Sequence, residues 1–130
     1  MRLFRNALLA GFCIAAFAAH AEPASERYGE EYQTCRDGNT YEIVTCLTAL
    51  YKKWNERVEA AYKKLLGMQE DAKSRAALEA AQKSWLKYRD DNCEWYETGE
   101  GTIRRLWGSE CMRSMTAARA RELEEAGETH

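Results

Sequence analysis

The strongest constraint on the fold is an apolar stripe that recurs every three or four residues in the first half of the chain. Its members are Ile43, Leu47, Leu50, Trp54, Val58, Ala61 and Leu65. This spacing places all of them on one face of an α-helix. Asn39 and Glu42 have the spacing of a capping box at the helix start, and Gly67 is a typical residue at a helix end. The sequence therefore predicts a long amphipathic helix from Asn39 to Gly67.

Two further stripes predict two more helices. The second helix is expected from Asp71 to about Glu97, on the stripe Leu78, Ala81, Trp85 and Tyr88. The segment TGEGT at 98–102 breaks it, because two glycines favour a tight turn. Thr102 can cap the third helix, whose stripe is Ile103, Leu106, Trp107, Cys111, Met115 and Leu123. Gly108 lies inside and weakens this helix by about 1 kcal/mol relative to alanine, so a break there with Ser109 as a new cap is the alternative.

These patterns predict an all-α fold. Strand-like alternation of any length is missing from the sequence, and short links between amphipathic helices favour antiparallel neighbours. We expect a small array of three antiparallel helices over residues 39–126. Residues 22–38, with Pro23, Gly29 and Gly38, are expected to form an irregular N-terminal arm.

The first 21 residues have the pattern of a secretory signal peptide. Arg2 and Arg5 give a basic start, an apolar run follows at 8–17, and Ala19-His20-Ala21 offers a cleavage site. An apolar run of roughly ten residues is too short for a convincing membrane span, so a retained anchor is the weaker alternative. Lipidation of Cys13 is disfavoured because Phe12 precedes it. We expect a periplasmic or secreted mature chain that begins at Glu22 and has no membrane span.

The charge balance argues against nucleic acid as a partner. All 21 acidic residues follow the expected cleavage site, whereas two of the 19 basic residues precede it, so the mature net charge is −4. The mature chain has no basic run of the kind that binds nucleic acid or a membrane surface.

Four cysteines remain in the mature chain, and an even number in a short secreted chain predicts disulfides. They are Cys35, Cys46, Cys93 and Cys111. Zinc is disfavoured because no pair has C-x2-C spacing and the only histidine of the mature chain is His130. The same shortage of histidine removes the common Cys-His and Ser-His catalytic arrangements. We therefore expect no metal, no cofactor and no enzymatic activity, with hydrolysis by the acids Asp90, Asp91 and Glu94 as a minor alternative.

The sequence LEAAQKSWLKYRDDNC at 78–93, followed by a Gly-containing turn and CMRSMTAARARELEE at 111–125, resembles the LprI-type lysozyme inhibitor family. The shared pattern includes Gln82, Trp85, Arg89, Asp90, Thr116 and Arg119, beside Cys93 and Cys111. Cys35, Asn39, Glu42 and Cys46 fit the first half of the same pattern. The turn departs from the family's usual Gly-Gly-Ser form. From their positions we expect Arg89 and Arg119 to have structural roles at helix edges, in hydrogen bonds with Asp90, Thr116 or turn carbonyls, and Asp90 to reach a basic residue such as Arg119.

The resemblance implies a secreted or periplasmic helical protein that binds lysozyme and blocks hydrolysis of peptidoglycan. The alternative is a non-catalytic accessory protein of the cell envelope with another protein partner. Of the three possible disulfide pairings, Cys35–Cys46 and Cys93–Cys111 are favoured, because each closes a short loop at a helix end. A crossed Cys46–Cys93 pair remains open.

The turn at 97–102 is the candidate contact surface, because it projects between two helices close to a cysteine. Thr98 and Thr102 offer hydroxyl groups, Arg104 is a donor for a carboxylate, and Trp95 and Trp107 are candidate aromatic anchors. One alternative is that Trp107 and Tyr96 pack against each other in the core. Another is that the contact surface lies on the N-terminal arm with Tyr28 and Tyr32.

Overall fold

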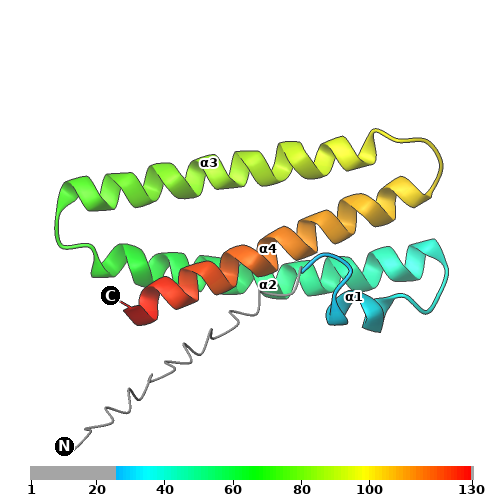
Figure 1. The fold of residues 1–130 in the computed structure, drawn as a ribbon, viewed down its shortest axis with the longest axis horizontal. Helices are drawn as coiled ribbons and strands as arrows, with labels where there is room; N and C mark the ends of the chain where they lie inside the picture. Colours follow the sequence, from blue (N-terminus) through cyan, green and yellow to red (C-terminus); the bar gives the residue numbers. More distant parts are fainter. Residues whose placement is uncertain (1–25, 130) are drawn as a thin grey trace, which may run out of the picture.

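One short and three long α-helices make up the chain, as the computed structural model shows for residues 26–129, the residues it describes (Figure 1). The helices are α1 (Glu30–Cys35), α2 (Thr40–Met68), α3 (Ala72–Glu97) and α4 (Ile103–Thr129). The predicted all-α fold is confirmed, and the three long helices run antiparallel to their neighbours in the chain. The expected signal peptide at 1–21 lies outside the described residues.

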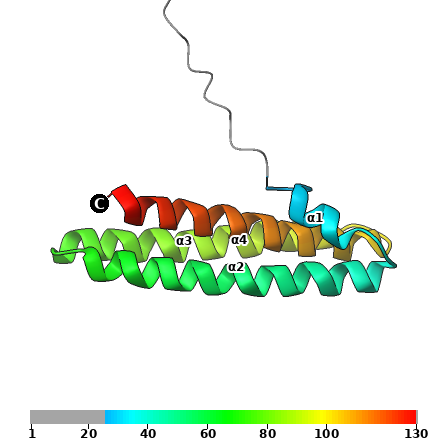
Figure 2. The same ribbon diagram turned by 90° about the horizontal axis from the view of Figure 1, so that it is seen from below.

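Helix α4 holds the array together, because it packs along both α2 and α3 while α2 and α3 barely touch (Figures 1 and 2). Toward the C-terminal end of α4 the core contains Trp54, Val58, Ala61, Leu65, Ala117, Ala120 and Leu123. A second apolar cluster joins Cys35, Ile43, Leu47 and Leu106 near the start of α2. Among the described residues, no helix has the length and apolar character needed to cross a membrane.

The start of α2 confirms the predicted capping box. The Asn39 side chain accepts hydrogen bonds from the amides of Tyr41 and Glu42, and the Asn39 amide donates to Glu42 Oε2 at 2.8 Å. The predicted end at Gly67 is wrong, because α2 continues to Met68. Gln69 takes the cap position, where its side chain donates to the Leu65 carbonyl at 3.0 Å.

The arm departs from the expected irregular segment, because α1 lies within it. Glu30 and Glu31 occupy the first turn of α1, where acidic side chains interact favourably with the helix dipole. Cys35 ends α1 and is bonded to Cys46 of α2. A helix of six residues spans fewer than two turns, so it has too few positions to show a helical period in the sequence.

Both favoured disulfides are present, and the crossed Cys46–Cys93 alternative is wrong. The Cα atoms lie 5.5 Å apart in Cys35–Cys46 and 5.4 Å apart in Cys93–Cys111. The first disulfide ties α1 to α2 and the second ties α3 to α4. Both therefore lie toward the end of the array where the α3–α4 turn projects.

Helix α4 passes through Gly108 without interruption, so the alternative of a break at this residue is wrong. A β-carbon at Gly108 would lie 2.3 Å from Cγ of Glu97 in the last turn of α3. Glycine at this position lets the Glu97 side chain cross directly over the backbone of α4.

Candidate functional site

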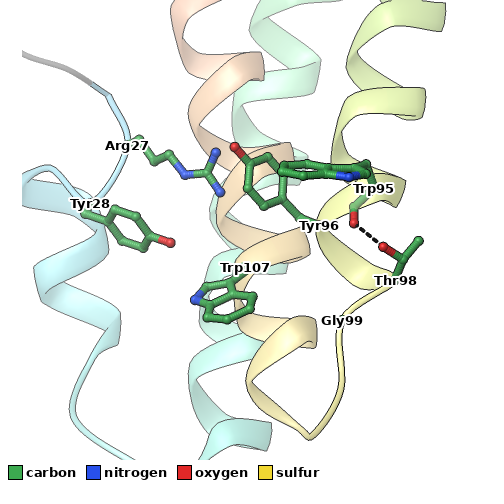
Figure 3. Close-up of a pocket in the computed structure, with 7 residues that line it drawn as sticks. All are labelled: Arg27, Tyr28, Trp95, Tyr96, Thr98, Gly99 and Trp107. Atoms are coloured by element: carbon green, nitrogen blue, oxygen red, sulfur yellow. Dashed lines mark hydrogen bonds between the residues drawn. The ribbon is translucent and has the colours of Figure 1, made fainter.

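A hollow of about 530 Å³ lies where the N-terminal arm meets the α3–α4 turn (Figure 3). Seven residues line it: Arg27, Tyr28, Trp95, Tyr96, Thr98, Gly99 and Trp107. Four of them are aromatic, and they come from three separate parts of the chain. The site therefore forms only when the arm is fixed against the end of the helical array.

Two rings of the hollow meet edge to face, and both tryptophans remain open to solvent. Trp95 and Tyr96 meet at an interplanar angle of 67°, with their ring centroids 4.7 Å apart. Trp95 is 64% exposed and Trp107 is 39% exposed. The alternative in which Trp107 is a core residue packed on Tyr96 is therefore wrong, since its indole borders the hollow (Figure 3).

The guanidinium group of Arg27 lies over one wall of the hollow. Its central carbon is 3.9 Å from the centroid of the Tyr96 ring and 5.5 Å from that of Tyr28. At these distances the cation is attracted to the negative face of the ring. Arg27 thus brings a positive charge into an otherwise aromatic and uncharged site.

The structure brings together three of the five residues expected to contact a partner. Trp95, Thr98 and Trp107 line the hollow. Thr102 lies outside it and borders a second hollow beside the start of α2. Arg104 also lies outside and donates to the Gly99 carbonyl at 3.4 Å.

The arm and the turn form one surface, although the sequence suggested them as alternatives. Tyr28 of the arm faces Trp107 across the hollow, and its ring meets Tyr32 edge-on with centroids 4.9 Å apart (Figure 3). Arg27 was not expected from the sequence. A single basic residue in a charged arm has no pattern that marks it as part of a site.

Tyr28 is held in an unusual backbone conformation. Its φ angle is +57°, a region that non-glycine residues seldom occupy. Its amide donates to Oε1 of Glu110 at 2.8 Å, and the Glu110 side chain is completely buried. Such strain persists only where the surrounding structure enforces it. Glu110 therefore positions the Tyr28 wall of the hollow.

A buried arginine completes the attachment of the arm. Arg113 donates to both carboxylate oxygens of Glu110, at 2.8 and 2.7 Å, and to Glu31 of α1 at 2.7 Å. Arg113 also donates to the Glu26 carbonyl. Burial alone lowers the pKa of Arg113, but the hydrogen bonds and charges of Glu110 and Glu31 outweigh burial, so the pKa is raised. The buried arginine stays charged and joins the arm to α4.

The buried pair of Glu110 and Arg113 was not expected, although the sequence contains a pattern that indicates it. Leu106, Glu110, Arg113 and Ala117 follow one another at helical spacing along α4, and all are buried. The predicted stripe instead began at Ile103, which is exposed. Two opposite charges three residues apart within an apolar stripe indicate a buried ion pair.

The residues of the predicted motif gather between α3 and α4. Gln82 accepts two hydrogen bonds from Arg119, at 3.1 and 3.0 Å. Arg89 and Arg119 lie 5.0 and 5.7 Å from the Trp85 ring centroid, and Arg89 donates to Asp90 at 2.9 Å. Asp90 was expected to reach Arg119, which instead pairs with Glu122 at 2.8 Å.

Thr116 was named beside Arg119 as a hydrogen-bonding partner, and its hydroxyl does not take that role. The side chain is buried in α4, and within residues 26–129 its hydroxyl group has no hydrogen-bond partner. Arg119 donates to Gln82 on the neighbouring helix instead. Arg119 thus joins α4 to α3, and Thr116 takes no part in that contact.

Two of the three acidic residues that are candidates for hydrolysis, Asp90 and Asp91, lie beside cations. Asp90 is paired with Arg89 at 2.8 Å, and Asp91 is paired with Lys87 one turn earlier in α3. Across residues 26–129, no group of three or more His, Cys, Asp or Glu side chains could hold a metal ion.

The described residues define a small disulfide-linked helical protein with an aromatic hollow at one end. A family model described as Lysozyme inhibitor LprI matches residues 32–123. The chain belongs to this family, as the sequence pattern predicted. Searches of the curated proteins and of the solved structures gave no match.

Proposed function

We propose that the mature chain binds a lysozyme and blocks hydrolysis of peptidoglycan, without catalytic activity of its own. The observation that carries this proposal is the family match over residues 32–123. The two disulfides fit an extracytoplasmic protein, because such bonds persist in oxidising compartments. We place the mature chain in the periplasm or outside the cell, after cleavage near Ala21.

The α3–α4 turn is the proposed contact element. The Cys93–Cys111 disulfide joins the two helices just behind the turn. Thr98 donates its hydroxyl proton to the Trp95 carbonyl at 2.7 Å, and Arg104 donates to Gly99. A turn ordered in this way loses little conformational freedom on binding, which favours affinity.

Charge determines which atoms of the turn would lie deepest in a lysozyme cleft. Lysozymes hydrolyse glycosides with a pair of carboxyl groups. Glu97 and Glu100 would be repelled there and are better placed at the rim, where negative charge speeds encounter with a cationic enzyme. Arg104 and the hydroxyls of Thr98 and Thr102 are the proposed inner contacts, with Trp95 and Trp107 as flanking anchors.

Single alanine substitutions of Thr98, Thr102 and Arg104 test the contact surface. Each purified variant is first checked for native helicity and melting temperature, and then for inhibition of lysozyme-driven lysis of peptidoglycan. Arg75→Ala, at the opposite end of the array, is the matched control. We expect weaker inhibition from at least one turn variant and no change from the control.

Two outcomes contradict parts of the proposal. Unchanged inhibition in all three variants would place the contact surface elsewhere. A wild-type protein that neither binds nor inhibits any lysozyme type in a pull-down and lysis assay would favour an accessory role with another envelope protein.

A further inference from the structure

We propose that the hollow between the arm and the α3–α4 turn binds a carbohydrate, specifically a pyranose ring that carries a carboxylate group. This binding is a separate property from inhibition of lysozyme, since it needs no contact with the enzyme. It follows from the size of the hollow, its exposure, its charge and the way in which Tyr28 is held.

The size of the hollow fits a small ligand. Its volume of about 530 Å³ lies within the range of small-molecule sites, and it has seven lining residues. A stable protein–protein interface uses roughly 20–30 residues on each side. One or two sugar rings therefore fit the hollow itself, which would be only a small part of a protein contact surface.

The solvent exposure of the aromatic side chains in the hollow favours an amphipathic ligand. Because Trp95 is 64% exposed, a molecule seated against it keeps one side in water. A purely apolar ligand would leave apolar surface in contact with solvent. A pyranose ring presents C–H groups on its face and hydroxyl groups around its edge, so it can cover an indole ring while its polar groups remain hydrated. The edge-to-face contact of Trp95 with Tyr96 leaves ring surface available for such stacking.

Arg27 indicates that the ligand carries a negative charge. It is the one charged residue among the seven that line the hollow. Its guanidinium group lies near the Tyr96 and Tyr28 rings, and within residues 26–129 it forms no ion pair with an acidic side chain. A cation–π contact uses none of the five N–H donors of arginine, so these donors can bind a ligand. A carboxylate is the matching acceptor, because charge-assisted hydrogen bonds to arginine are strong and geometrically specific.

The rigidity of the arm wall also indicates a binding role. The left-handed conformation of Tyr28 is enforced by the bond from its amide to buried Glu110. Strain of this kind is concentrated at ligand sites, where it holds side chains ready for contact. Since Arg27 precedes Tyr28, the same attachment positions the cation and the aromatic ring together.

The test uses two disaccharides that differ in a carboxylate. The neutral probe is the disaccharide of N-acetylglucosamine. The acidic probe links N-acetylglucosamine to N-acetylmuramic acid, whose lactyl ether carries a carboxylate. Isothermal titration calorimetry of the full mature chain measures both dissociation constants. We expect the acidic probe to bind roughly 10-fold more tightly, as one hydrogen bond to a charged group provides.

Two variants separate stacking from charge recognition. Trp95→Ala should weaken the binding of both probes by about 2-fold to 10-fold, the size of an aromatic contact. Arg27→Gln should remove the preference for the acidic probe and leave the affinity for the neutral probe unchanged. Tyr88→Ala is the control for Trp95, because Tyr88 is 61% exposed on the same helix outside the hollow. Arg36→Gln is the control for the loss of one positive charge.

The proposal is overturned if neither disaccharide binds at millimolar concentration, or if both variants bind like the wild type. Loss of lysozyme inhibition in the same variants, without any saccharide binding, would make the hollow a protein contact and leave the proposed function standing. Saccharide binding by a protein that inhibits no lysozyme would support the hollow as a sugar site and refute the proposed function.

Discussion

Replacement of Arg113 by methionine tests the buried attachment of the arm. Methionine keeps most of the side-chain length but removes all the donors that reach Glu110, Glu31 and the Glu26 carbonyl. Arg113 and Glu110 are both 0% exposed, so the variant would leave a buried carboxylate without its cation. Breaking such a pair on one side costs about 3–5 kcal/mol of unfolding free energy.

That loss is large compared with the total stability of a small domain, which is about 5–15 kcal/mol. It corresponds to a fall in melting temperature of roughly 12 °C or more, at 4–8 °C per kcal/mol. The assay is urea unfolding followed by far-ultraviolet circular dichroism, with the disulfides intact. The slope of free energy against urea should stay unchanged, because the same surface is exposed on unfolding.

A second substitution separates the effect of the unpaired buried charge on stability from the effect of the changed side-chain shape. In the double variant Arg113→Met with Glu110→Gln, the amide oxygen can still accept from the Tyr28 amide, while the buried charge is gone. We expect the double variant to recover a substantial part of the lost stability. A single variant that loses less than about 1 kcal/mol, the scale of an exposed pair, would refute the reasoning. So would a double variant less stable than the single one.

Three further predictions concern other contacts. Arg89→Ala should lower the melting temperature, because Arg89 is buried against Trp85 and bonded to Asp90, and unchanged stability with loss of partner binding would contradict its structural role. The hydrogen bond from Arg57 to Glu124 lowers the pKa of Glu124 below its ordinary value of 4.5. The pair therefore stabilises the fold above that pH, and stability should fall less steeply on acidification below pH 4.5 in Glu124→Gln than in the wild type. Gly108→Ala should gain up to about 1 kcal/mol of helix propensity if exposed Glu97 rotates away. Thermal unfolding of Gly108→Ala, in the wild type and in Glu97→Ala, measures that gain. A large loss of stability in both backgrounds would show that α3 and α4 cannot move apart to make room for the methyl group.

Much of the fold follows from local sequence patterns. The stripe from Ile43 to Leu65 and the Asn39–Glu42 capping box predicted α2, since both depend on residues within one or two helical turns. The end at Met68 was missed by one residue because the Gln69 cap uses a side-chain bond that glycine statistics do not anticipate.

The hollow could be predicted only in part, because it depends on contacts between distant residues. Trp95, Thr98 and Trp107 were identified from their places around the turn. The Tyr28 wall depends on a bond to Glu110 across 82 positions of sequence. A contact between residues so far apart in the sequence gives no periodic pattern. The sequence therefore suggested the arm and the turn as alternative sites, whereas they form one site.

The two disulfides place both covalent links between helices at one end of the array. Cys35–Cys46 and Cys93–Cys111 both lie toward the end that carries the hollow, while the α2–α3 link and the end of α4 lie at the other (Figure 1). Local opening of a helix costs least where few constraints hold it. Backbone amides near Gln69 should therefore exchange with deuterium long before those around Cys46 and Cys111. Local opening should therefore be most frequent near the α2–α3 link. The helix ends around the aromatic hollow should open least often.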